Sequence, residues 1–266
     1  MTYVICALLT LVAISVFHRT IAHTHIVKNY AYILSMGLPL FFNIKRKDIR
    51  NICLTLAILA IFMQWSWIGL ACIVITYTVV FMGNKKFLAV WIPACLILSF
   101  LVIPHVYPKF DSIGSDSVGR IKYYEYAMQK WQHKFLGEGF RAWSRLPENQ
   151  PGASSPIKQG HTIERWAHVV HSDLIQGLIE FGAVRMFYIV CLLILPIALI
   201  RIDTLFNKTL LASYLCLLFQ ACVDFPFHRA ITGSFGVWLI LMMYREGLSE
   251  ECRLMKLCNH EEMTCE

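Results

Sequence analysis

The sequence predicts an all-α protein, a polytopic integral membrane helix bundle with a long extracytoplasmic (periplasmic) helical loop between late membrane helices. Three observations predict this class. Hydrophobic residues make up 57% of the 266 residues and charged residues only 15%, which is less charge than the surface of a soluble domain needs. Long apolar runs recur along the chain. Basic residues gather in the short connections between these runs.

The apolar runs give the expected membrane helices and the expected regions. They fall at about 3–17, 29–43, 52–64, 67–82, 87–105, 183–200, 207–223 and 229–244. Some are shorter than the ~20 residues that a perpendicular helix needs, so we expect tilt or burial against neighbours. The expected regions are 1–105 with about five helices, the extracytoplasmic loop 106–182, 183–244 with three helices, and the cytoplasmic tail 245–266.

The stretch 52–82 is either one helix or a tight hairpin. One helix of that length would greatly overshoot the bilayer. The polar break at Gln64, Trp65 and Ser66 favours a hairpin, with tryptophan at interface depth. We therefore expect two helices here. Separately, we expect the N-terminal apolar run to act as an uncleaved signal anchor.

Basic residues set the orientation of the predicted bundle. In the eight-helix scheme the segment KRKDIR (45–50), the pair Lys85-Lys86, Arg201 with Lys208, and Arg245 all fall on one side. The positive-inside rule makes that side cytoplasmic and leaves the loop 106–182 and the segment 224–229 outside. The net charge of +7 is scattered between apolar segments, so nucleic acid is not an expected partner.

The spacing of the cysteines and histidines matches no known metal-binding pattern, and we expect neither a metal centre nor a cofactor. None of the ten cysteines falls between residues 106 and 180, so the loop lacks disulfides. The tail cysteines and His260 do not have zinc-site spacing. His168 and His171 lack the glutamate of an HExxH metalloprotease, and no glycine-flanked serine elbow is present.

Two helices are expected in the long loop. Residues 119–135 carry apolar side chains at helical spacing, with Gly137 and Gly139 ending the helix. The second helix is expected to begin near Thr162 and to continue past Gly182 into the membrane. The loop then forms an amphipathic shelf and not an independent domain.

A polar stripe enters the second of these helices. In the segment AHVVHSDLIQGLIEFG (167–182), polar residues recur every four positions, and His171 and Asp173 flank them. The stripe consists of His168, Ser172, Gln176 and Glu180. Polar side chains on a membrane helix face protein or water. They serve either as hydrogen-bonding glue between helices or as a functional site, and the length of this stripe at the outer mouth of a bundle favours a site.

Arginines of the loop offer a second chemistry. Arg120, Arg141, Arg145 and Arg165 are either solvated, bound to lipid headgroups, or suited to phosphate, because a guanidinium donates bidentately and keeps its charge.

These residues give the C-terminal two-thirds of the chain a resemblance to the O-antigen ligase and O-antigen polymerase family of bacterial membrane proteins. Three segments carry it, in the family's order. GRIKYYEYAMQKWQHKFLGEGF (119–140) opens with Gly-Arg and closes with Gly-x-Gly-Phe. HSDLIQGLIEFG (171–182) is similar to a His-Asn-x-x-Leu-Gln…Glu-x-Gly signature, with serine at 172. DFPFHRAITGSFGVWLIL (224–241) resembles the approach to a late membrane helix.

The resemblance implies a metal-independent glycosyltransferase of the bacterial inner membrane. It would transfer a glycan from a polyprenyl-diphosphate carrier to a lipid or glycan acceptor in cell-surface polysaccharide synthesis, such as that of lipopolysaccharide. His171 would be the general base, or would orient the acceptor hydroxyl, and Arg120 would bind the diphosphate. The implied substrate-binding residues are His168, Arg141, Arg145, Gln176, Glu180, Asp224 and His228.

Two features depart from the family. Trp67 stands where an arginine is usual at an outer hairpin tip, and the chain has fewer N-terminal helices than most members. Two other functions therefore stay open: a lipid-linked glycan transporter or export component, and a non-catalytic assembly partner.

Overall fold

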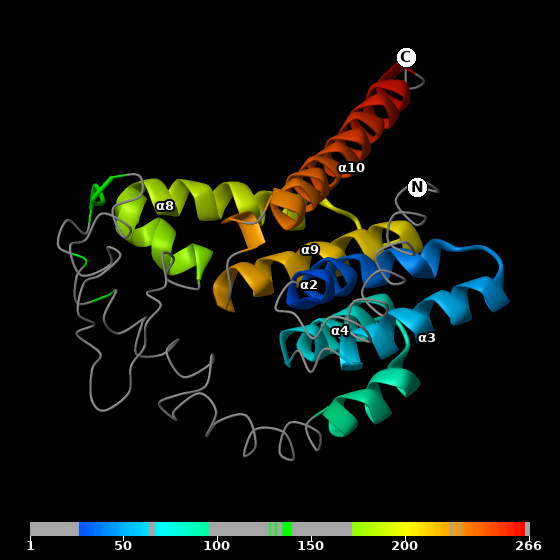
Figure 1. Ribbon diagram of the computed structural model, residues 1–266. Coiled ribbons are helices and arrows are strands. Elements are labelled where there is room, and N and C mark those ends of the chain that lie inside the picture. Colours follow the sequence, from blue (N-terminus) through cyan, green and yellow to red (C-terminus); the bar gives the residue numbers. More distant parts are fainter. Residues whose placement is uncertain are drawn as a thin grey trace. The chain divides into compact units, whose positions relative to one another are not determined.

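The computed structural model describes residues 27–63, 67–95, 128, 131, 135–139, 172–223, 226–228 and 230–263 (Figure 1). Within these ranges every regular element is a helix and there is no strand, which confirms the predicted all-α class for this part of the chain. The chain divides into two compact units. The first unit comprises Met1–Leu88, Leu192–Gln220 and Pro226–Glu266, and the second comprises Ala89–Cys191 and Ala221–Phe225.

The helices follow the apolar runs of the sequence. They are α2 (Val27–Gly37), η1 (Leu38–Asn43, a 3-10 helix), α3 (Lys47–Met63), α4 (Trp67–Val80), α8 (Asp173–Leu199), α9 (Leu205–Val223), η3 (Pro226–His228, also 3-10) and α10 (Ala230–Met263). Residues 85–95 are helical as well. Two of these helices, α8 and α9, are long and apolar enough to cross a membrane.

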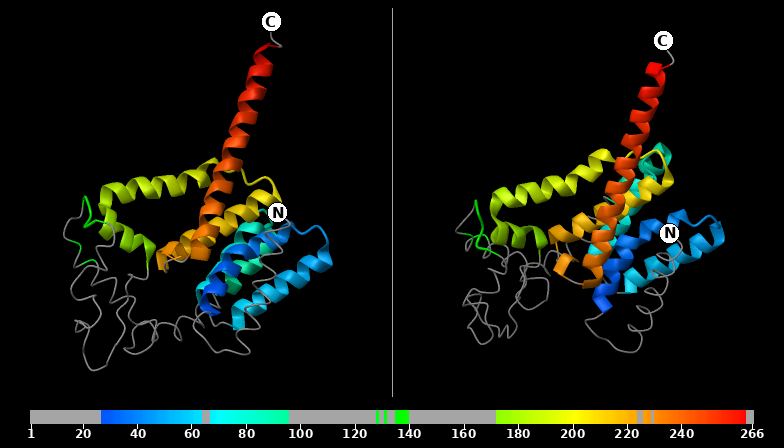
Figure 2. Two further views of the ribbon diagram at one scale, coloured as in Figure 1. Left: turned by 45° about the horizontal axis from the view of Figure 1, so that its top comes forward. Right: turned by 90° about the horizontal axis from the view of Figure 1, so that it is seen from above.

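The stretch 52–82 forms two helices, as the polar break predicted. The first helix, α3, ends at Met63, and α4 begins at Trp67. The two helices contact each other, and α2 packs against both (Figures 1 and 2). Pro39 at the second residue of η1 fits the start of a helix, because that position needs no intrahelical N–H donor.

Apolar side chains of α2, η1, α3, α4 and α9 form the core of the first unit. Phe41 and Tyr214 are the largest side chains that are completely buried there. The Tyr214 hydroxyl donates a hydrogen bond of 2.7 Å to the Leu193 carbonyl, so the buried ring keeps a partner for its polar group. The remaining large, fully buried side chains are Leu34, Met36, Leu38, Leu40, Ile61, Ile68, Leu210 and Leu217.

A stripe of buried polar residues runs along one face of α9. Its members are Thr209, Ser213, Cys216 and Gln220, each less than 5% exposed. Their spacing of three or four residues places them on one side of the helix. The side chains of Thr209, Cys216 and Gln220 form hydrogen bonds with groups of neighbouring helices, as polar glue does in packed apolar bundles.

The ends of this stripe make the best-defined contacts. At one end the Asn43 amide donates to the Thr209 hydroxyl at 2.7 Å. At the other end the Gln220 amide donates to the Ser35 hydroxyl at 3.0 Å and to the Tyr32 carbonyl at 3.2 Å. These bonds fix both the lateral position and the register of α9 against η1 and α2.

A tight turn leads into α10. The Thr232 hydroxyl donates to the Pro226 carbonyl, and a Cβ atom at Gly233 or Gly236 would press against Phe227. The helix then continues without a break past residue 244, where the apolar run of the sequence ends.

Candidate functional site

The helix α8 begins with a side-chain cap at Ser172. The Ser172 hydroxyl accepts a hydrogen bond from the Ile175 amide at 3.3 Å, and its carbonyl accepts one from the Gln176 amide at 3.0 Å. Serine is a favoured N-cap because its side-chain oxygen satisfies an otherwise free N–H group. Ser172 itself is not helical. The prediction of one continuous helix from near Thr162 is therefore wrong, because the cap starts a helix at Asp173.

The polar stripe of α8 faces the protein interior. Ser172, Gln176 and Glu180 are 1%, 6% and 3% exposed. The Gln176 amide donates to the Glu180 carboxylate at 2.8 Å across one helical turn. This confirms, for these three residues, that the stripe turns inward.

Gly182 breaks α8 immediately after the stripe. Its φ of 74° and ψ of 170° are not helical, and they lie in a region that is essentially restricted to glycine. The helix continues past Gly182 to Leu199, as predicted, but the conformation of Gly182 bends it at that residue (Figure 1).

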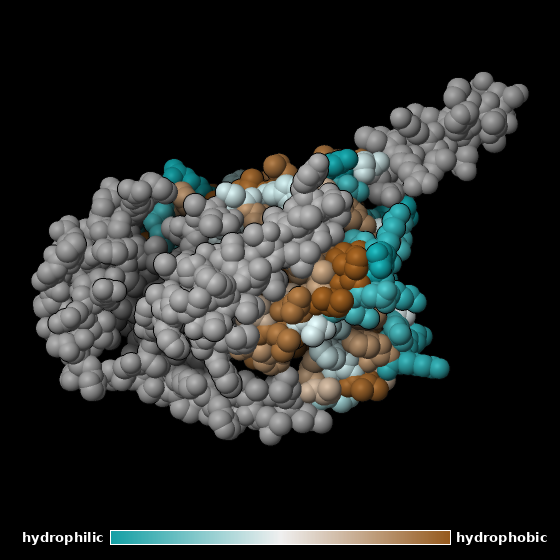
Figure 3. Space-filling model, turned by 45° about the vertical axis from the view of Figure 1, so that its right-hand side comes forward, coloured by the Kyte–Doolittle hydropathy of each residue, from teal (hydrophilic) through white to brown (hydrophobic). Residues whose placement is uncertain are grey.

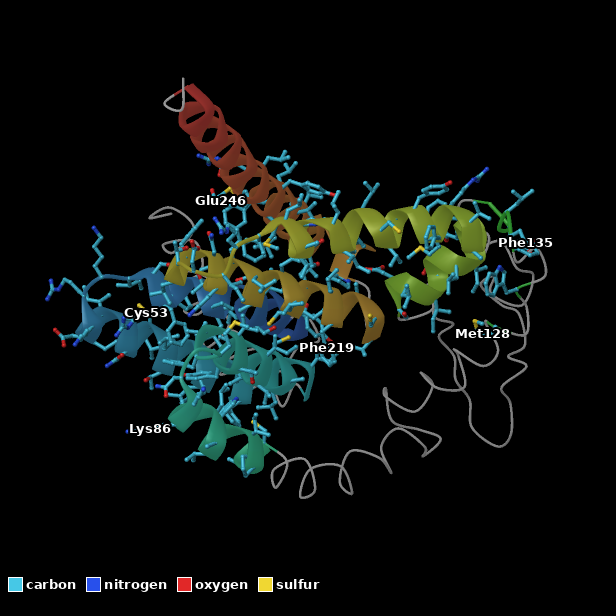
Figure 4. All side chains as sticks on the ribbon, turned by 180° about the vertical axis from the view of Figure 1, so that it is seen from behind. Cys53, Lys86, Met128, Phe135, Phe219 and Glu246 are labelled. Carbon is cyan, nitrogen blue, oxygen red and sulfur yellow. The ribbon has the colours of Figure 1, made fainter. Side chains whose placement is uncertain are left out.

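The bend frees backbone groups that a distant segment then binds. The carbonyl groups of Ile179 and Glu180 accept hydrogen bonds from the amides of Glu138 and Gly139, at 2.8 and 3.0 Å. Phe135, beside the bend (Figure 4), accepts a bond from the Val184 amide at 3.3 Å. We name residues 135–139 the docking segment. Its backbone groups form hydrogen bonds with groups of α8 that the bend leaves without a partner inside the helix.

Two glycines allow this close approach. Gly137, with a φ of 77°, lies against the backbone of Glu180 and Gly182. A Cβ atom on either glycine would overlap backbone atoms of the other segment. Gly139 also has a positive φ, 91°. The glycines predicted to end the loop helix therefore do turn the chain. The helix predicted over 119–135 is interrupted, because Met128 is helical and Trp131 is not.

Glu180 carries the only described charge of the stripe. Its side chain is buried, and among the described residues Gln176 is its polar partner. A carboxylate out of water is costly unless hydrogen bonds or a cation balance it. Ser172 and Glu180 are eight residues apart, about 12 Å along the axis at the α-helical rise. The Glu180 carboxylate therefore lies near the bend at Gly182 and far from the start of the helix.

The structure describes only some of the predicted site residues. Gln176 and Glu180 are brought together, and His228 lies in η3. The others lie outside the described residues, namely Arg120, His168, His171, Arg141, Arg145 and Asp224. Within the described ranges no three His, Cys, Asp or Glu side chains gather as metal ligands would.

Sequence reasoning missed the contact between the docking segment and the bend. The signal was present as two short glycine-containing stretches, LGEG (136–139) and EFG (180–182). Neither stretch shows alone that it pairs with the other. Comparisons with protein-family models, with curated proteins and with solved structures find no match to this chain.

Proposed function

We propose that this chain is a multi-pass protein of the bacterial inner membrane that transfers a glycan from a polyprenyl-diphosphate carrier to an acceptor hydroxyl. The observation that carries the proposal is the bond pattern at the bend of α8. The segments 119–140 and 171–182 carry the resemblance to O-antigen ligases and polymerases, and backbone hydrogen bonds join their ends. This junction brings the end of the first segment next to the end of the second.

The membrane setting is supported by α8 and α9, which have the length and apolar composition of spanning helices. In the proposed topology the loop 106–182 lies on the periplasmic side, where lipid-linked glycan and acceptor meet. The buried stripe of Ser172, Gln176 and Glu180 then belongs to the interior of the protein near that face.

The proposed chemistry assigns two principal roles. His171, which directly precedes the capping Ser172, takes the proton of the acceptor hydroxyl or orients that hydroxyl, since an imidazole titrates near neutral pH. Arg120 holds the diphosphate and stabilises the negative charge that grows on it as the glycosyl bond breaks. Arg141, Arg145, His168, Asp224 and His228 serve as further substrate contacts.

Glu180 acts in this proposal as a positioning residue. Its carboxylate holds Gln176, and its carbonyl accepts the Gly139 amide. One residue thus links the stripe to the docking segment. Glu180→Gln keeps the shape of the side chain, whereas Glu180→Ala removes the contact with Gln176. We expect the alanine variant to lose more glycan transfer than the glutamine variant, because the contact and not the charge fixes the geometry.

The proposal is tested by glycan linkage analysis in a strain that lacks the gene and expresses single variants. We expect His171→Ala and Arg120→Ala to abolish ligation or chain extension at normal expression levels. His260→Ala and Arg253→Ala make the same chemical changes in the tail and should leave glycan display unchanged. Full glycan display by both loop variants would refute the mechanism.

The same experiment separates the alternatives. Loss of attachment indicates a ligase, and loss of chain length indicates a polymerase. Lipid-linked glycan that accumulates on the cytoplasmic side, with purified protein that flips it and transfers nothing, indicates an export component. Loss of display that neither His171→Ala nor Arg120→Ala reproduces indicates an assembly partner.

A further inference from the structure

Three chain connections of the first unit lie at the same end of that unit. The connection between η1 and α3 spans 44–46, the one after α4 spans 81–84, and the one before α9 spans 200–204. The Asn43–Thr209 hydrogen bond of 2.7 Å joins the first to the third. Lys208 Nζ lies 3.7 Å from the position that a Cβ atom would take at Gly83, which joins the third to the second.

Aromatic contacts join the first connection to the second. The ring centroids of Phe42 and Phe81 are 5.7 Å apart, and those of Phe81 and Phe87 are 4.6 Å apart. Phe42 lies three residues before Lys45, and Phe87 directly follows Lys86. The positions of these connections are therefore fixed by packing and not by sequence proximity.

Cationic side chains converge at this end, and we name them the basic rim. The basic rim consists of Lys45, Arg46, Lys47, Arg50, Lys85, Lys86, Arg201 and Lys208, all exposed or partly exposed. The acidic residues of the same connections are Asp48 and Asp203. Cations outnumber anions by a wide margin, and such a concentration attracts anionic partners.

Helix geometry adds to the positive potential. The helices α3 and α9, of 17 and 19 residues, both begin at this end. The N-terminus of a helix carries a partial positive charge from its unsatisfied N–H groups. Asn84 caps the helical turn that follows it, with a bond of 3.1 Å to the Phe87 amide, so a third helix starts here as well.

Exposed apolar side chains alternate with the cations. Ile49 and Ile52 are 40% and 59% exposed, Met82 is 38% exposed, and Ile202 and Leu205 are 40% and 45% exposed. Each lies within three residues of a basic rim residue. Figure 3 shows hydrophilic and hydrophobic side chains next to each other on one face. A small soluble anion has no apolar part that would contact these side chains, and a nucleic acid exposes mainly its charged backbone. A phospholipid, in contrast, presents both a phosphate and an acyl chain.

We propose that the basic rim binds the headgroups of anionic phospholipids, with the neighbouring isoleucine, leucine and methionine side chains at the level of the first acyl carbons. The cations and the helix N-termini face the lipid phosphates. This surface consists of other residues than those of the proposed glycan transfer, and it fixes the depth and the tilt of the first unit in the bilayer.

Lipid retention on the purified full-length protein tests the proposal. The protein, in a neutral detergent, is titrated with phosphatidylglycerol or with phosphatidylcholine, and retained lipids are counted by native mass spectrometry. Thermal midpoints are measured in parallel. We expect selective retention of phosphatidylglycerol and a higher midpoint with it. Raising the ionic strength to about 1 M, where the screening length falls to roughly 3 Å, should weaken the retention.

A charge-matched pair of variants locates the surface. In the first, Lys45, Arg46, Lys85 and Lys86 are changed to glutamine. In the control, the loop lysines Lys122, Lys130, Lys134 and Lys158 are changed in the same way. A basic residue near an anionic surface contributes roughly fivefold to lipid affinity, so the four changes of the first variant should lower the affinity roughly six-hundredfold, with little change in the control.

Several outcomes would overturn the proposal. Equal retention of the two lipids, or equal losses in the two variants, would show that the rim does not select anionic headgroups. Equal stabilisation by a short oligonucleotide or by inorganic phosphate would show a general anion site. If the quadruple variant does not fold, Lys85→Gln with Lys86→Gln alone should still lose roughly twentyfold in affinity, and an unchanged affinity would contradict the assignment.

Discussion

Gly182→Ala tests the bend of α8 most directly. The substitution adds a single Cβ atom at a backbone conformation of φ 74° and ψ 170°, and this atom would overlap the backbone of Phe135 and Gly137. The variant must either keep a strained conformation or expel the docking segment. Strain in such a region costs about 1–3 kcal/mol, and the three backbone hydrogen bonds at the bend contribute roughly 1 kcal/mol each.

Relief of the overlap requires the docking segment to leave, so we expect the closed arrangement to lose about 3–5 kcal/mol relative to the open one. Amide hydrogen exchange of residues 135–139, followed by mass spectrometry, measures this difference. The amides of Glu138 and Gly139 are protected by their bonds to the carbonyl groups of α8. We expect their protection to fall roughly a hundredfold to a few thousandfold, because 1.4 kcal/mol corresponds to a factor of ten.

Gly177→Ala is the matched control. It makes the same change five residues earlier in α8, where the nearest atom to the new Cβ is the flexible Met186 side chain, at 2.8 Å. Alanine favours a helix by about 1 kcal/mol over glycine, so protection of residues 135–139 should stay at the wild-type level. Unchanged protection in Gly182→Ala, or an equal loss in Gly177→Ala, would refute the argument.

Three further changes probe the caps and the polar stripe of α9. Ser172→Ala removes the N-cap of α8 and should cost about 1 kcal/mol, measured as faster exchange of the Ile175 amide, and unchanged exchange there would contradict the cap. Thr209→Val leaves the Asn43 amide without its 2.7 Å partner and should lower stability by about 1–3 kcal/mol, measured by thermal unfolding, with the isosteric Thr55→Val, at an exposed position of α3, as a comparison. Gln220→Leu removes three buried hydrogen bonds, to the Tyr32 carbonyl, the Ser35 hydroxyl and the Cys72 sulfur, and also an amide oxygen that has no partner among the described residues. We expect it to destabilise less than Gln220→Ala, which leaves a cavity as well.

The sequence by itself determined where the helices lie. Apolar runs and their length predicted α3, α4, α8 and α9, and the polar residues at 64–66 predicted that α3 and α4 are separate helices. These features depend on local composition, because hydrogen bonds within a helix and an apolar face require no distant partner. The four-residue spacing of Gln176 and Glu180 predicted in the same way that they share one face of the helix.

Tertiary structure decided where α8 bends, while a local cap at Ser172 decided where it begins. A serine and a glycine occur in helices as well as at their ends, so Ser172 and Gly182 did not show from sequence that they start and break this helix. The break at Gly182 is stabilised by the docking segment, about 45 residues earlier in the chain, because that segment satisfies backbone groups that the bend exposes.

The basic rim shows the same division between sequence and structure. The sequence determined that basic residues occupy the connections between apolar runs, and hence their common side. Only the packing of Phe42, Phe81 and Phe87 and the bond from Asn43 to Thr209 brought those connections together. Charge is a property of each residue, whereas the electrostatic potential of a surface depends on the distances between residues that are far apart in the chain.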